Sequence, residues 1–154
     1  MGIEKMDQVT QTILLVDDND ADVGLIRRFL SKGPDAPKLM VARDGEEGLE
    51  ILQHKPPFRG MPRPDLVVLD LDLPRKTGRE VLAEIRADPE LQSIPVVVFT
   101  TCDSPQILNS AYQLKADRCM TKPGDLDEYA RVVRAIEEFW SDVAKSEPHT
   151  GQVM

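Results

Sequence analysis

The sequence predicts an α/β fold built around a parallel sheet. Three runs are apolar without interruption: residues 13–16 (Ile-Leu-Leu-Val), 66–69 (Leu-Val-Val-Leu) and 95–99 (Pro-Val-Val-Val-Phe). Strands with one face in water alternate between apolar and polar residues, whereas strands covered on both faces are continuously apolar. Amphipathic segments lie between these runs, and strands that alternate with helices form a parallel sheet with right-handed crossovers.

Two shorter runs, residues 38–42 and 118–121, complete a set of five predicted strands. Helix starts are indicated by capping residues: Asp44 with Glu47 three positions later, Thr77 before Gly78, and Ser104 before Pro105. The helices are expected over about 21–31, from 44, over 77–88, from 104, and from 125 through at least 140.

Five strand–helix units in 154 residues fit the flavodoxin-like doubly wound fold, with strand order 2-1-3-4-5. We expect one domain over residues 11–145, preceded by a flexible N-terminus (1–10) and followed by a disordered C-terminal tail (146–154).

Composition limits the possible functions. The net charge of −8 argues against a nucleic-acid surface, which needs a positive field. No apolar run approaches the roughly 20 residues of a membrane-spanning helix, and the polar N-terminus lacks a signal-peptide segment. The two cysteines, Cys102 and Cys119, lack metal-site spacing. We therefore expect a cytoplasmic protein with reduced thiols.

The strands of this predicted sheet end in residues that carry chemistry. Asp17 and Asp18 follow the first strand, Asp70 follows the third, Thr100 ends the fourth, and Lys122 follows the fifth. The carboxyl ends of parallel strands share one edge, where such sheets bind ligands. Clustered carboxylates repel unless a cation joins them, and Mg²⁺ prefers oxygen ligands. This combination predicts a Mg²⁺ and phosphoryl site.

The same residues carry a resemblance to a known family. Over roughly residues 11–143 the chain resembles the receiver domain of two-component response regulators. The motifs that carry the resemblance are residues 14–18 (Leu-Leu-Val-Asp-Asp), 64–74 (Pro-Asp-Leu-Val-Val-Leu-Asp-Leu-Asp-Leu-Pro), 97–101 (Val-Val-Phe-Thr-Thr) and 121–123 (Thr-Lys-Pro).

The resemblance implies that Asp70 accepts a phosphoryl group from a phosphohistidine on a partner histidine kinase. It further implies that Asp17, Asp18, Asp70 and the backbone carbonyl of Asp72 hold Mg²⁺. The protein would be a phosphoacceptor rather than an enzyme, apart from slow hydrolysis of its own acyl phosphate.

By the same resemblance, Lys122 pairs with one phosphoryl oxygen and Thr100 donates a hydrogen bond to another. The movement of Thr100 would switch the face formed by the helix after Ser104, the strand 118–121 and the last helix. Receivers usually carry an aromatic residue three positions before the lysine. Here that position is Cys119, which puts a switch based on an aromatic flip in doubt.

Because the receiver region fills the chain, we expect a stand-alone regulator, resembling the short regulators paired with bacterial phytochrome histidine kinases. Phe139 and Trp140 near the end of the last helix either cover the core or form a homodimer contact through that helix, as in the resembled subgroup.

Two alternatives use the same residues differently. A pseudo-receiver would be a binding module that no longer takes phosphate, against which the full set of site residues argues. The run Asp70-Leu71-Asp72 resembles the first motif of haloacid-dehalogenase-like phosphatases. In that family the motif lies on the first strand and the metal-binding acid pair comes late, the reverse of the order here.

Overall fold

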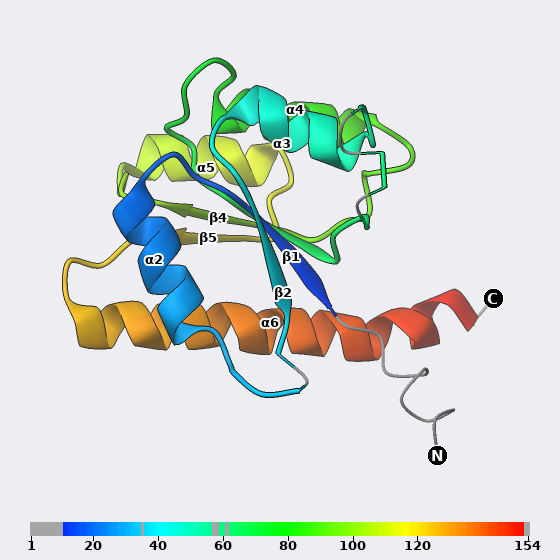
Figure 1. Ribbon diagram of the computed structural model, residues 1–154. Helices are drawn as coiled ribbons and strands as arrows, with labels where there is room; N and C mark the ends of the chain where they lie inside the picture. The colour runs from blue at the N-terminus through cyan, green and yellow to red at the C-terminus, as the bar shows by residue number, and fades with distance from the viewer. Residues whose placement is uncertain (1–10, 35, 57–58, 61, 153–154) are drawn as a thin grey trace.

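The computed structural model describes residues 11–34, 36–56, 59–60 and 62–152, so the segment 1–10, expected to be flexible, lies outside the described residues. Within them a five-stranded parallel sheet lies between two layers of helices (Figure 1). The elements are β1 (Thr12–Val16), α2 (Asp20–Phe29), β2 (Lys38–Ala42), α3 (Gly45–Leu52), β3 (Leu66–Leu69), α4 (Gly78–Ala87), β4 (Val96–Thr100), α5 (Pro105–Gln113), β5 (Arg118–Thr121) and α6 (Leu126–Gln152).

The strand order is β2-β1-β3-β4-β5 with every pair parallel, which confirms the predicted flavodoxin-like fold. The register places Val16 opposite Leu69, the last residues of β1 and β3. Asp70 then continues the pairing, since its backbone N–H donates to the carbonyl of Val16 at 3.0 Å. The acids that follow β1 and β3 are therefore brought side by side by the sheet itself.

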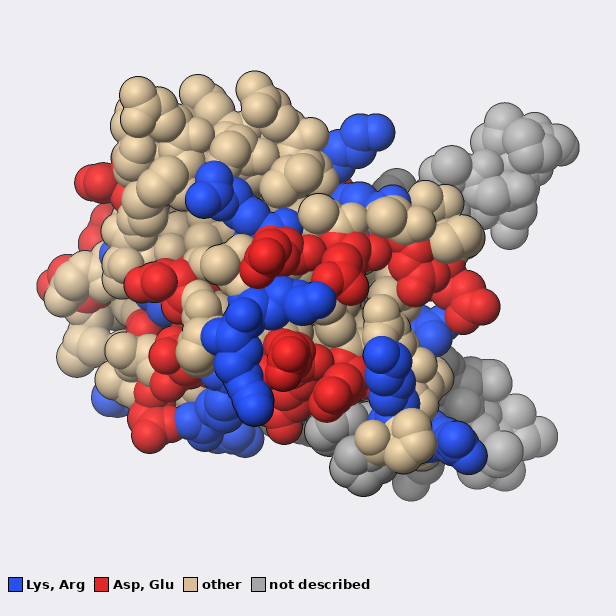
Figure 2. All heavy atoms as spheres, turned by 90° about the horizontal axis from the view of Figure 1, so that it is seen from above, with Lys and Arg blue, Asp and Glu red and all other residues tan. Residues whose placement is uncertain are grey.

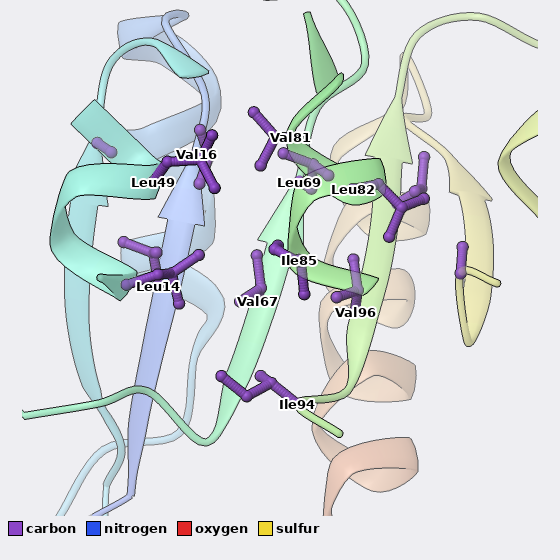
Figure 3. Packing of buried hydrophobic residues seen from close by; sticks show 14 of the residues in the cluster. Leu14, Val16, Leu49, Val67, Leu69, Val81, Leu82, Ile85, Ile94 and Val96 are labelled. Atoms are coloured by element: carbon purple, nitrogen blue, oxygen red, sulfur yellow. The ribbon is translucent and has the colours of Figure 1, made fainter. Parts of the chain in front are cut away.

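Alternate residues of the strands fill two cores. Leu14 and Val16 of β1 face the layer of α3, α4 and α5, while Ile13 and Leu15 face the layer of α2 and α6. Figure 3 shows the first core, in which Leu82 and Ile85 of α4 pack on the strands. This two-sided burial explains why the central strands are apolar throughout.

The helix starts agree with most of the predicted caps. Thr77 and Glu80 form a reciprocal capping box at α4. At α3, the Asp44 carboxylate accepts from the Glu47 N–H at 2.8 Å, but the Glu47 carboxylate accepts from Arg43 instead of returning to Asp44. Ser104 occupies the N-cap position of α5 without a side-chain cap bond, and Pro105 in the first turn supplies the preset helical φ.

The last helix, α6, extends into the segment that was expected to be a tail. Residues 146–152, expected to belong to a disordered tail, continue this helix to Gln152, and residues 153–154 lie outside the described residues. Extending an existing helix costs far less than nucleating one, which favours continuation beyond the apolar stripe. Among the described residues, no helix is both long and apolar enough to cross a membrane.

Candidate functional site

Three strand ends deliver their side chains to one point. Asp17 follows β1, Asp70 follows β3 and Lys122 follows β5, and all three are buried. The Lys122 ammonium nitrogen lies 2.7 Å from Asp17 Oδ2 and 3.0 Å from Asp70 Oδ2. The sheet thus brings together residues that are 52 and 105 positions apart in the sequence.

Asp18 joins the same cluster from the solvent side. One carboxylate oxygen from each of Asp17, Asp18 and Asp70 lies within 4.8 Å of the other two, and Asp18 is exposed. Asp72 was expected to contribute its backbone carbonyl. Its N–H donates to Asp70 Oδ1 at 3.2 Å, which orients the carboxylate of Asp70.

The electrostatics of this cluster are those of an acidic site with one built-in cation. Burial raises the pKa of Asp17, despite the hydrogen bond from Lys122 that opposes the shift. Burial by itself lowers the pKa of Lys122, but the hydrogen bonds to Asp17 and Asp22 and the charge of Asp70 outweigh it and raise this pKa above its usual range. Lys122 is therefore charged, whereas burial disfavours the ionised form of the Asp17 carboxylate.

Thr100 ends β4 next to this cluster. Its side-chain oxygen is fully buried and has no hydrogen-bond partner among the described residues. A buried hydroxyl without a partner is costly unless another group uses it. Thr100 also lines a cavity of about 350 Å³ together with Leu71 and Asp72, which directly follow Asp70. An oxygen-rich group seated there would satisfy the hydroxyl.

Gly78 at the start of α4 allows the backbone to approach Asp70 closely. A Cβ atom at this position would lie 2.2 Å from the carbonyl oxygen of Asp70. Since that separation is impossible between non-bonded atoms, only glycine lets α4 begin here with its present packing. The N–H of Gly78 donates to the carbonyl of Leu71 at 3.1 Å, which fastens the loop that carries Asp70.

Two residues of the site were not predicted from the sequence. Asp22, on the first turn of α2, places Oδ2 2.8 Å from the Lys122 ammonium, and Tyr129 of α6 donates its hydroxyl hydrogen to Asp22 Oδ1 at 2.7 Å. The sequence offers a weak signal for Asp22, which is an acid shortly after the Asp17-Asp18 pair. It offers none for Tyr129, whose helical spacing is that of a core residue.

Cys119 lies away from this cluster, on β5 beside α5. It is half-buried, its N–H donates to the Tyr112 hydroxyl oxygen at 3.2 Å, and burial raises the pKa of its thiol. Both Cys119 and Cys102 are free, as expected.

The face formed by α3, α4 and α5 carries acidic and basic side chains interspersed with each other beside an uncharged area (Figure 2).

Comparison with known proteins decides the family. Residues 13–134 match the model of the response regulator receiver domain. This chain belongs to the response regulator receiver domain family. Response regulator Rcp1 of Synechocystis sp. is 40% identical over 130 residues, which are 84% of this chain and 88% of Rcp1.

Solved structures of receiver domains give the same result. The phosphorylated cyanobacterial phytochrome response regulator RcpA is 40% identical, with a TM-score of 0.82 over 86% of this chain and 94% of RcpA. The Mn²⁺-bound form of Rcp1 is 40% identical, with a TM-score of 0.80 over 84% of this chain and 94% of that one. The receiver domain described here is therefore related to phytochrome response regulators, as the sequence predicted.

Proposed function

We propose that this receiver domain accepts a phosphoryl group on Asp70 from a partner histidine kinase, in a reaction that depends on Mg²⁺. The observation that carries the proposal is the buried Asp70 carboxylate, which has Lys122 3.0 Å away on one side and the Asp17 and Asp18 carboxylates within 4.8 Å. An acid held beside a lysine and two further acids is arranged for phosphoryl chemistry with a metal rather than for support of the fold.

The residues present fit a magnesium ion. Carboxylate oxygens of Asp17, Asp18 and Asp70 already converge, and the backbone carbonyl of Asp72 would complete the protein ligands. A cation beside Asp17 would stabilise the ionised carboxylate that burial disfavours, and the unpartnered Thr100 hydroxyl could donate to an oxygen of a phosphoryl group. When bound, Mg²⁺ would offset the negative charge on the transferring group.

In the proposed reaction, a carboxylate oxygen of Asp70 attacks the phosphorus of the kinase phosphohistidine. The new O–P bond forms as the P–N bond breaks, and the imidazole leaves with the electron pair. Lys122 offers a compact positive charge to one phosphoryl oxygen, and the Thr100 hydroxyl donates to another. The protein contributes position and electrostatics and undergoes no further covalent change.

Phosphorylation would be transmitted through Thr100 to the face formed by α5, β5 and α6. Movement of Thr100 toward the phosphoryl group would pull on the loop between β4 and α5, which begins at the next residue. Cys119 occupies the place on β5 where receivers usually carry an aromatic. The response of this face would therefore rest on the backbone and on α5 rather than on a ring that changes rotamer.

The partner kinase is proposed to be of the phytochrome type, since RcpA is a phytochrome response regulator by name and shares 40% identity with this chain.

We further propose a homodimer through α6. Phe139 and Trp140 are half-buried against the core, and Trp140 also lines a surface hollow of about 620 Å³ beside Phe29 and Pro37. Sedimentation over a concentration series tests the dimer, which a monomer at high concentration would exclude.

The proposed reaction is tested by intact mass after incubation with acetyl phosphate and Mg²⁺. A single phosphoryl adduct is expected in the wild type, and none in Asp70→Asn or in the presence of EDTA. If no adduct forms, and a beryllium fluoride mimic with Mg²⁺ causes no spectral shifts, the pseudo-receiver alternative is correct. Asp72→Asn serves as a matched control, because it removes a neighbouring charge and leaves the acceptor.

A further inference from the structure

The ammonium group of Lys122 uses all of its hydrogen-bond donors on carboxylates. Its nitrogen lies 2.7 Å from Asp17 Oδ2, 2.8 Å from Asp22 Oδ2 and 3.0 Å from Asp70 Oδ2. An ammonium has three N–H donors and no acceptor, so these contacts exhaust it. Any phosphoryl oxygen that binds Lys122 must take over one of these three hydrogen bonds.

The carboxylate of Asp22 is held on both of its oxygens. Oδ2 accepts from Lys122, and Oδ1 accepts from the Tyr129 hydroxyl at 2.7 Å. Tyr129 is itself buried and fixed, with its ring centroid 5.4 Å from that of Phe99 in an edge-on arrangement and 6.2 Å from that of Phe29. Burial and the neighbouring Asp22 raise the pKa of Tyr129, so the phenol remains a donor.

Asp22 also stands apart from the acids that converge as possible metal ligands. That group consists of Asp17, Asp18 and Asp70, and Asp22 has no oxygen in it. With one oxygen on a lysine and the other on a phenol, Asp22 can influence the reaction, apart from the long-range effect of its charge, only through Lys122. The same holds one step further out for Tyr129, which touches Asp22 and not the ammonium.

We propose that Asp22 and Tyr129 are positioning residues that hold Lys122 in place for the phosphoryl group. The inference rests on the proposed function of Asp70 as acceptor. The contact from Lys122 to Asp70 is the longest of the three, and it is the one that a phosphoryl group on Asp70 would replace. Asp17 and Asp22 keep the nitrogen in place during that exchange, and Tyr129 keeps Asp22 aimed at it.

The variants are Asp22→Ala, Tyr129→Phe and the double variant, with Asp22→Asn as a milder change should Asp22→Ala fail to fold. Asp20→Ala is the matched control. Asp20 lies on the same helix and carries the same charge, but its side chain is exposed and pairs with Arg43. A long-range charge effect would appear in both Asp20→Ala and Asp22→Ala, whereas positioning affects Asp22→Ala alone.

The first readout is the side-chain ammonium signal of Lys122 in ¹⁵N-edited NMR of the metal-free protein, which is visible only while its protons are held in hydrogen bonds. We expect the signal in the wild type and in Asp20→Ala, weakening in Tyr129→Phe and Asp22→Asn, and loss in Asp22→Ala. An unchanged signal in Asp22→Ala, or no signal in the wild type, would overturn the inference.

The second readout is the rate constant of phosphorylation by acetyl phosphate at saturating Mg²⁺. We expect the rate constant to fall about tenfold in Asp22→Ala, which loses one hydrogen bond to a charged group. We expect it to fall about threefold in Tyr129→Phe, because the lost phenol donor contacts Asp22 and not Lys122 itself. In the Asp22→Ala background, Tyr129→Phe should have no further effect, because it acts only through Asp22. Additive decreases would overturn the role of Tyr129.

The two readouts separate this inference from the proposed function. If the wild type takes no phosphoryl group, the proposed function fails, while the metal-free NMR signal still decides whether Asp22 and Tyr129 position Lys122. If phosphorylation occurs and every variant matches the wild type in rate, the proposed function stands and the inference fails.

Discussion

Asp17 Oδ2 and the Lys122 ammonium nitrogen lie 2.7 Å apart in a site where both side chains are almost completely buried. Asp22 and Asp70 share the same ammonium. One positive charge therefore serves several carboxylates, and the site carries an excess of negative charge before any metal or phosphoryl group binds. This excess determines how stability should respond to substitution, metal and pH.

Asp17→Asn should stabilise the metal-free protein, because burial disfavours the ionised carboxylate of Asp17 in the folded state. The folded state holds the pKa of Asp17 above its ordinary 3.8, so the ionised carboxylate costs stability at neutral pH. Urea unfolding with and without Mg²⁺ measures the effect. Mg²⁺ should stabilise the wild type and leave Asp17→Asn nearly unchanged; equal stabilisation of both would contradict the prediction.

The free energy of unfolding of the wild type should decrease more steeply at alkaline pH than that of a Tyr129→Phe variant. The pKa values of Tyr129 and Lys122 are both raised above their ordinary 10.0 and 10.5, so the folded state keeps protons that the unfolded state has released. Where the folded state binds more protons, stability decreases as pH rises. Urea unfolding at a series of alkaline pH values gives the slope, and identical slopes for the wild type and Tyr129→Phe would refute the prediction.

Arg86→Ala should destabilise the domain by about 3 kcal/mol, because it leaves a network on the far edge of the sheet unpaired. Arg86 donates to Asp117 Oδ2 at 2.9 Å and to three backbone carbonyls, and the same Asp117 oxygen accepts from the Val96 N–H at 2.7 Å. Arg79→Ala is the control on the same helix: among the described residues its side chain hydrogen-bonds to the Ser110 hydroxyl alone, at 3.5 Å, and its loss should cost less than about 0.5 kcal/mol.

Gly78→Ala should both destabilise the protein by about 2 kcal/mol or more and slow the proposed phosphorylation, because the added methyl group meets the Asp70 carbonyl and must displace the loop that carries Asp70, the proposed acceptor. Gly24→Ala is the matched control. Gly24 lies in α2 with open space around a Cβ, and its replacement should stabilise by about 0.5–1 kcal/mol. Unfolding and phosphorylation rates of the two variants test this; similar stabilities would contradict it.

The parts of the site that could be predicted were those attached to strand ends. Asp17, Asp70, Thr100 and Lys122 each follow or end an apolar run, and parallel strands have no freedom to send these ends to different edges. The prediction for Ser104 was less complete, since a capping residue type indicates where a helix begins and not whether its hydroxyl makes the bond.

The sequence alone determined the α/β class, the order of the elements and the set of residues at the sheet edge, because these depend on local periodicity and on the direction of parallel strands. Only the tertiary structure decided that Asp22 and Tyr129, 107 positions apart, meet beside Lys122. Periodicity says which face of α2 or α6 is buried but not which residue of another element it meets. That depends on how both helices pack across the same sheet.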